Sequence, residues 1–94
     1  MKGVRRFKDY LKEELKGKEF KEAFEKEEIY ADLAIQIAKL RQKKGFTQAE
    51  LAKVLHTTQQ TISRLEDPRN KSLSLNTLIE IAHALDKHLK IQFI

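Results

Sequence analysis

The sequence predicts an all-α fold, and three observations lead to that prediction. Apolar residues recur every three or four positions through most of the 94 residues, which is the spacing of amphipathic helices. A Ser or Thr stands just before several of these stretches, where helix-capping side chains are preferred. Glycine or proline stands where several of them end: Gly17, Gly45 and Pro68. Only the last segment, 88–94, departs from the helical spacing.

The first half of the chain contains two apolar stretches. One ends at Gly17 and has Phe7, Tyr10, Leu11 and Leu15 at helical spacing. The other ends at Gly45 and includes Phe20, Ala23, Phe24, Tyr30, Leu33, Ala34, Ile37 and Leu40. The segment 18–44 is compatible with one long helix or with two, and we expect a break in the charged run 26–29.

Three shorter helices are expected after Gly45. Thr47 and Glu50 form a capping-box pattern ahead of a helix over 47–55, with Leu51, Ala52, Val54 and Leu55 on its apolar face. Thr58 is the expected cap of a helix over 59–66 that buries Ile62 and Leu65 and ends before Pro68. Ser74 caps the last helix, whose apolar stripe is Leu75, Leu78, Ile79, Ala82 and Leu85.

The segment 88–94, HLKIQFI, alternates apolar and polar residues. Leu89, Ile91 and Phe93 fall on one side, which is the period of a β-strand. A lone strand has no partner in an otherwise helical chain. Three alternatives follow: it pairs with a second copy in a homodimer, it joins the sheet edge of another protein, or it packs as an extended tail.

The composition restricts the functions open to the chain. No cysteine is present, which excludes disulfides and Cys-based zinc sites. The three histidines lack carboxylates at ligand spacing, and no Gly-rich phosphate loop or nucleophile–base pairing occurs. We therefore expect no enzyme, no metal and no cofactor. No apolar run approaches the ~20 residues of a membrane span, and the first residues lack the apolar core of a secretory signal, so we expect a cytoplasmic protein.

Positive charge is concentrated in the second part of the chain. The formal net charge is +5, and residues 31–94 carry ten Lys and Arg against six Asp and Glu. Residues 1–30 are nearly neutral, with nine against eight. A basic surface on residues 31–94 favours a polyanionic partner such as nucleic acid.

The stretch HTTQQTISRLED, residues 56–67, has more hydrogen-bonding side chains than solubility requires. Two short helices joined by a tight turn at His56 and Thr57 have the geometry of a helix-turn-helix. The outward side chains of the second helix are polar: Gln59, Gln60, Thr61, Ser63 and Arg64. Gln can bond adenine bidentately, Arg can bond guanine, and the Thr methyl can meet a thymine methyl. The pattern indicates base reading in a major groove; the alternative is a merely solvated helix face.

The stretch TQAELAKVLHTTQQTISRLED resembles the helix-turn-helix of the lambdoid phage repressors and the wider Xre-type regulators. Its TTQQ core and the following Ile and Leu-Glu are especially similar to the phage 434 repressor. The resemblance covers about residues 33–86 and implies a five-helix-type fold. It also implies base reading by Gln59, Gln60 and Arg64, and backbone phosphate contacts by Thr47, Gln48, Thr58, Arg69, Asn70 and Lys71.

Four further positions carry structural expectations from the same resemblance. Ala52 stands where the two motif helices cross, and Arg41 and Glu66 match a pair that forms an internal salt bridge in such domains. His56 occupies the turn position where the family usually has Gly. Because that position needs a positive φ, we expect His56 to be a strained turn residue.

The segment FKDYLKEELKGKEFKEAFE resembles the N-terminal extension of HigA-type antitoxins, in which a helix pair precedes an Xre-type motif. The resemblance implies that the protein neutralises a HigB-type toxin, a ribosome-dependent RNase, and represses its own operon. The residues expected to bind the toxin are Phe7, Tyr10, Leu11, Phe20 and Phe24. Two alternatives are that these side chains fold back onto the domain's own core, and that the protein is a stand-alone or prophage repressor.

The expected organisation therefore has three parts. Residues 1–30 form a helical extension that binds a partner, residues 31–87 form the DNA-binding domain, and residues 88–94 form a strand that dimerises through Leu89, Ile91 and Phe93. A homodimer would place two recognition helices about one DNA turn, ~34 Å, apart on operator DNA. The expected location is the cytoplasm, at the nucleoid when DNA is bound.

Overall fold

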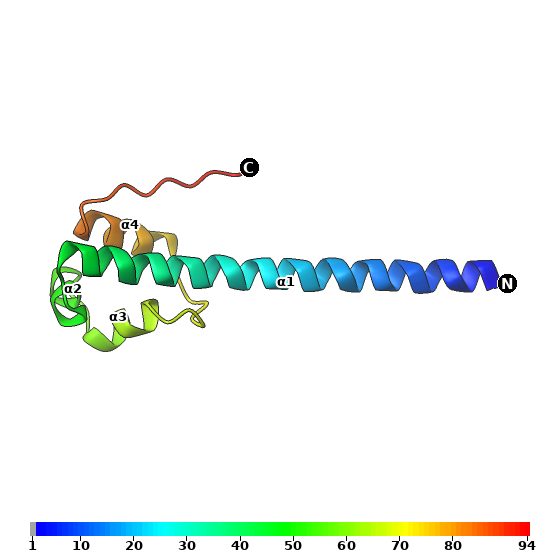
Figure 1. The fold of residues 1–94 in the computed structure, drawn as a ribbon, viewed down its shortest axis with the longest axis horizontal. Helices are drawn as coiled ribbons and strands as arrows, with labels where there is room; N and C mark the ends of the chain where they lie inside the picture. Colours follow the sequence, from blue (N-terminus) through cyan, green and yellow to red (C-terminus); the bar gives the residue numbers. More distant parts are fainter. Residues whose placement is uncertain (1) are drawn as a thin grey trace.

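The computed structural model describes residues 2–94, with side chains from residue 9 onward (Figure 1). Its helices are α1 (Lys2–Lys44), α2 (Gln48–Val54), α3 (Gln59–Leu65) and α4 (Leu75–Ala84). The last three pack around the C-terminal third of α1, and the rest of α1 projects away from them, so the molecule measures 66 × 27 × 20 Å. The all-α prediction is confirmed, but the described residues contain four helices and not five.

The expected break within residues 18–44 is wrong, because α1 is one helix of 43 residues that continues through Gly17 as well. The run 26–29 contains only residues that a helix tolerates, without Gly or Pro. Glu14, Lys18, Glu22 and Lys26 alternate in charge at four-residue spacing, which favours a helix. One interior Gly costs only about 1 kcal/mol and does not outweigh these preferences.

All three predicted N-caps are confirmed. Thr47 forms a full capping box with Glu50: its Oγ1 accepts the Glu50 N–H at 3.1 Å, and the Glu50 carboxylate accepts the Thr47 N–H at 3.2 Å. Thr58 Oγ1 accepts the N–H of Thr61 at 3.2 Å, and Ser74 caps α4 in the same way. These contacts satisfy backbone donors that the first turn of a helix leaves unpaired.

Three helices end in the same way, with a left-handed residue that allows the chain to reverse. The residues are Gly45 after α1, His56 after α2 and Asp86 after α4, with φ of 85°, 55° and 55°. In each case the next N–H bonds a carbonyl five residues earlier; Thr57 reaches Ala52 at 2.9 Å. The positive φ expected at His56 is confirmed, and Asp86 is a second such position that the sequence did not reveal.

The hydrophobic core lies between the C-terminal third of α1 and the three short helices. Its buried residues are Ile37, Leu51, Ala52, Ile62, Leu65, Ile81 and Leu85. The expected burial of Ile62, Leu65 and Ala52 is confirmed. Two of the expected faces are shifted: Val54 is exposed, and on α4 Ile81 is buried in place of Leu75 and Ile79. Packing against α1 selects which apolar positions face inward, and spacing alone does not.

The segment that follows α4 is extended but forms no strand within residues 2–94. A strand requires backbone hydrogen bonds to a neighbouring strand, and this chain supplies none. Figure 1 shows the tail leaving the end of α4 and running back toward the level of the middle of α1, with α4 between it and α1 over the first part of its course. The β-strand expected over 88–94 is therefore unconfirmed.

Candidate nucleic-acid interface

The helix-turn-helix is formed by α2 and α3, which pack against each other around Ala52. Ile62 and Leu65 anchor α3 in the core, which turns the remaining side chains of this short helix outward. Gln59, Gln60, Ser63 and Arg64 are all exposed. The predicted base-reading residues therefore lie together on one exposed helix, with long side chains able to reach the floor of a major groove.

Thr61 differs from its four neighbours. It is half-buried, and its hydroxyl lies 2.9 Å from the hydroxyl of Thr58, the residue that caps α3. The two threonines hold the first turn of α3 in a fixed conformation. The hydroxyl of Thr61 thus makes one hydrogen bond within the protein.

A buried ion pair braces the two motif helices against α1. Arg41 donates from Nε to Glu66 at 2.6 Å and from Nη2 to the other carboxylate oxygen at 3.0 Å. Its Nη1 donates to the Phe46 carbonyl at 2.7 Å. The carboxylate hydrogen bonds raise the pKa of Arg41, so the guanidinium stays charged. The predicted Arg41–Glu66 salt bridge is confirmed.

Gln48 joins this arrangement from the start of α2. Its Nε2 donates to Glu66 Oε1 at 3.2 Å, and the side chain is half-buried. Glu66 lies at the end of α3, so the contact fixes the start of α2 relative to the end of the recognition helix. Gln48 was expected to hold phosphate; one of its two amide N–H groups is committed to Glu66, and the other remains available.

Three of the predicted phosphate ligands, Arg69, Asn70 and Lys71, lie in the loop after α3. Asp67 accepts three hydrogen bonds from Arg69: from the backbone N–H at 2.9 Å, from Nε at 3.2 Å and from Nη2 at 3.2 Å. The side-chain bonds and then the backbone bond lower the pKa of Asp67. Asn70 accepts the Ser72 N–H at 3.1 Å through its side-chain oxygen. Arg69 is 91% exposed at its side chain, so it can reach a phosphate only in competition with Asp67.

The other cation of the loop is paired with the long helix. Lys71 Nζ lies 2.9 Å from a carboxylate oxygen of Glu27 on α1. The sequence did not indicate Asp67 or Glu27 as partners of these two cations. Asp67 had a local signal, because an Asp side chain commonly accepts the backbone N–H of the residue two positions later in an Asx-turn. Glu27 had none, because residues 27 and 71 are brought together only by the fold.

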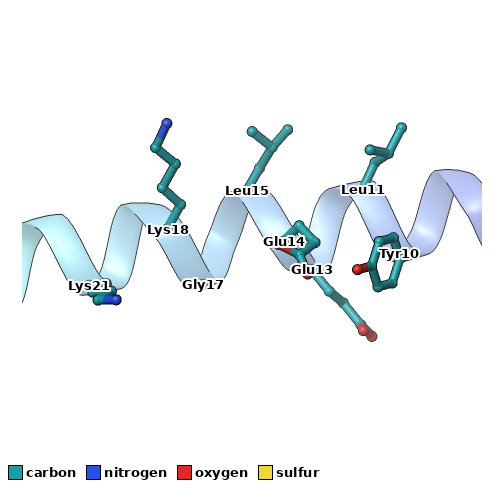
Figure 2. Close-up of a pocket in the computed structure, with 8 residues that line it drawn as sticks. All are labelled: Tyr10, Leu11, Glu13, Glu14, Leu15, Gly17, Lys18 and Lys21. Atoms are coloured by element: carbon teal, nitrogen blue, oxygen red, sulfur yellow. The ribbon is translucent and has the colours of Figure 1, made fainter.

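The projecting part of α1 carries most of the predicted partner-binding residues. Tyr10, Leu11, Phe20 and Phe24 are 57%, 44%, 74% and 55% exposed; the side chain of Phe7 lies outside the described residues. Figure 2 shows Leu11 and Leu15 on one side of the helix and Tyr10 on another. In this structure these side chains do not fold back onto the core.

The four helices and the polar recognition helix define a DNA-binding protein of the helix-turn-helix class. The chain belongs to the helix-turn-helix family HTH_3, whose model matches residues 37–91. It is thus an Xre-like regulator of transcription, and the match begins within α1 and extends past α4. Neither the curated proteins nor the solved structures include a significant match.

The part of the chain from residue 2 onward contains no helix that is both long and apolar enough to cross a membrane. The same part holds no group of three or more His, Asp or Glu side chains arranged to bind a metal ion.

Proposed function

We propose that the protein is a sequence-specific repressor of the HigA antitoxin type, which binds operator DNA through α3 and a toxin through the projecting part of α1. In this proposal Gln59, Gln60 and Arg64 read bases, and Thr61 and Ser63 contribute shorter contacts. Phosphates are held by Thr47, Gln48, Thr58, Arg69, Asn70 and Lys71. The homodimer forms through Leu89, Ile91 and Phe93.

The observation that carries the partner-binding half is the exposure of large apolar side chains on a helix that extends beyond its own domain. Phe20 and Phe24 lie four residues apart on one side of the helix, and neighbouring aromatic side chains of this kind are usually covered in soluble proteins. Leu11 and Leu15 precede Phe20 and Phe24 by nine residues, or two and a half helical turns, so they share the opposite side of the helix. Apolar residues on more than one side suit a helix that a partner grips in a groove.

The base-reading half is tested by measuring DNA affinity with single substitutions. Gln59→Ala or Gln60→Ala should weaken binding to the operator by about 1–3 kcal/mol and leave binding to random DNA almost unchanged. Gln36→Ala, an exposed glutamine on α1, is the matched control and should have no effect. Equal losses on operator and random DNA would contradict base reading by these glutamines.

The partner-binding half is tested in cells. The reading frame adjacent to this gene is expressed alone, with the full chain, and with a chain lacking residues 1–24. This deletion retains Glu27 and its contact with Lys71. We expect the neighbour to arrest growth, the full chain to restore it, and the truncated chain to bind DNA without restoring growth.

Two double variants of the full-length chain test whether the rescue needs the apolar side chains of α1 or only the presence of the helix. Phe20→Ser with Phe24→Ser should abolish the rescue of growth, whereas Glu19→Ser with Lys21→Ser in the same turns should retain it.

A harmless neighbour would favour the second candidate, a stand-alone or prophage repressor, which the helix-turn-helix of this chain fits equally well.

A further inference from the structure

An apolar groove lies between α1 and the N-terminal part of α4. Its volume is about 400 Å³, and its apolar lining comes from Ile29, Tyr30 and Leu33 of α1 together with Leu73 and Leu78. Ile29 is 55% exposed, so the groove is open at this point. It lies apart from the recognition helix, and the proposed DNA contacts do not use it.

The rim of the groove is acidic. Glu22, Glu25 and Lys26 line it, and the surrounding segment 22–28 contains four glutamates and one lysine. An occupant that combines apolar side chains with positive charge would suit both the lining and the rim. The two features together restrict the chemistry of the occupant more than either does alone.

The segment 87–94 of this same chain has that combination. Leu89, Ile91 and Phe93 alternate with polar residues, so they lie on one side of an extended backbone. Phe93 is 99% exposed and Ile91 is 61% exposed. Lys87 and Lys90 supply positive charge and no acidic residue interrupts the segment.

The dimensions of the groove and the tail agree. Four extended residue steps from Leu89 to Phe93 span about 13 Å. The groove follows α1 from Glu22 to Leu33, a rise of about 16 Å in a helix. The three apolar side chains can therefore lie along the lining, and Lys87, two residues before Leu89 and on the same side of the extended backbone, can approach the glutamates of the rim.

We propose that this groove receives the 87–94 tail of a second copy of the chain, so that two copies exchange tails across a two-fold axis. The inference rests on the proposed homodimer and names the surface that its tail residues contact. Asp86 sets the direction in which each tail leaves its own domain: the Lys87 N–H bonds the Ala82 carbonyl at 2.8 Å, and Asp86 pairs with Lys44 of α1. In this direction Ile91 and Phe93 stay largely exposed on their own chain, and Leu89 is 38% exposed. A two-fold axis would make the contact twice.

The absence of cysteine permits a direct test by disulfide cross-linking of the full chain. One chain carries Ile29→Cys in the groove and another carries Ile91→Cys in the tail. The two are mixed, oxidised and resolved on a non-reducing gel. We expect a covalent dimer of the mixed pair at several times the yield obtained when Gln92→Cys, which faces the other side of the tail, replaces Ile91→Cys.

Each competing arrangement gives a different result and would overturn the proposal. Equal yields with Ile91→Cys and Gln92→Cys would show that the tail does not face the groove. A covalent dimer of Ile91→Cys alone at the yield of the mixed pair would indicate that tails pair with each other. If a chain that carries both cysteines forms only an intramolecular disulfide, the tail lies in the groove of its own chain. None of these outcomes depends on toxin neutralisation or operator binding, which the growth and DNA-affinity assays measure separately.

Discussion

The helices of the two halves of this molecule, the domain of residues 31–87 and the projecting part of α1, are stabilised in different ways. Residues 31–87 contain three short helices that are each capped and packed on a shared core, and two of them, α2 and α4, are followed by a left-handed residue. The projecting part of α1 has neither a core nor a tertiary neighbour over most of its length, and it depends on local helix preferences. Apolar residues therefore differ between the two halves: in one they are buried and stabilise the fold, and in the other they are exposed.

The largest expected difference between the halves concerns removal of an apolar side chain. Leu51→Ala should lower the free energy of unfolding by about 3 kcal/mol, because Leu51 is fully buried and its removal leaves a cavity. Phe20→Ala removes a larger side chain that is 74% exposed, and it should change stability by less than about 0.5 kcal/mol. Urea denaturation followed by circular dichroism measures both. A similar loss in the two variants would mean that the extension packs on a surface in solution.

The buried ion pair gives the next largest effect. Glu66→Gln should cost about 2 kcal/mol of stability, because it leaves the Arg41 charge facing a neutral amide at a site with little access to water. Arg41→Met combined with Glu66→Leu should recover part of that loss, since an apolar pair needs no compensation. Thermal unfolding of the two variants and the wild type supplies the comparison. Unchanged stability of Glu66→Gln would show that the pair orients α2 and α3 without stabilising them.

The contrast between halves also explains which features the sequence could predict. The caps Thr47, Thr58 and Ser74 and the positive φ of His56 are local, so a few neighbouring residues determine them. The length of α1 differs from the prediction because the helix preference lost at Gly17 is too small to end the helix. Burial of Ile81 in place of Ile79 depends on how α4 packs against distant residues. The contact of Lys71 with Glu27 likewise has no local signal.

Backbone conformation provides a smaller effect of the opposite sign. His56→Gly should raise stability by about 0.5–1 kcal/mol, because glycine adopts a φ of 55° without the steric cost that a side chain adds. Gly45→Ala is the reverse substitution and serves as the control. The added Cβ meets no atom, but the φ of 85° at this position should make the variant less stable by a similar amount. A His56→Gly variant that melts below the wild type would contradict the view of His56 as a strained turn residue.

In the projecting helix a glycine substitution should act only locally. Gly17→Ala should stabilise the surrounding turns by about 1 kcal/mol, because alanine has the higher helix preference and its Cβ meets no neighbour. The melting temperature of the domain should not change, since no core residue contacts this position. Amide hydrogen exchange over residues 10–24 would slow, whereas exchange in α2 and α3 would not. Slower exchange in both would mean that the two halves unfold as one unit.

The smallest effect concerns the loop between α3 and α4, and it depends on pH. Hydrogen bonds from Arg69 lower the pKa of Asp67, so its folded-state value lies below the unfolded one. Stability from this contact is therefore complete above the unfolded pKa and is lost as the pH falls through the folded pKa. Asp67→Asn should remove that part of the acid sensitivity, and the variant should lose less stability than the wild type on acidification toward pH ~3. Because both side chains reach solvent, the effect will be small. The same substitution should release Arg69 and steepen the salt dependence of DNA binding at neutral pH; a variant with the wild-type salt slope would show that Arg69 does not contact phosphate.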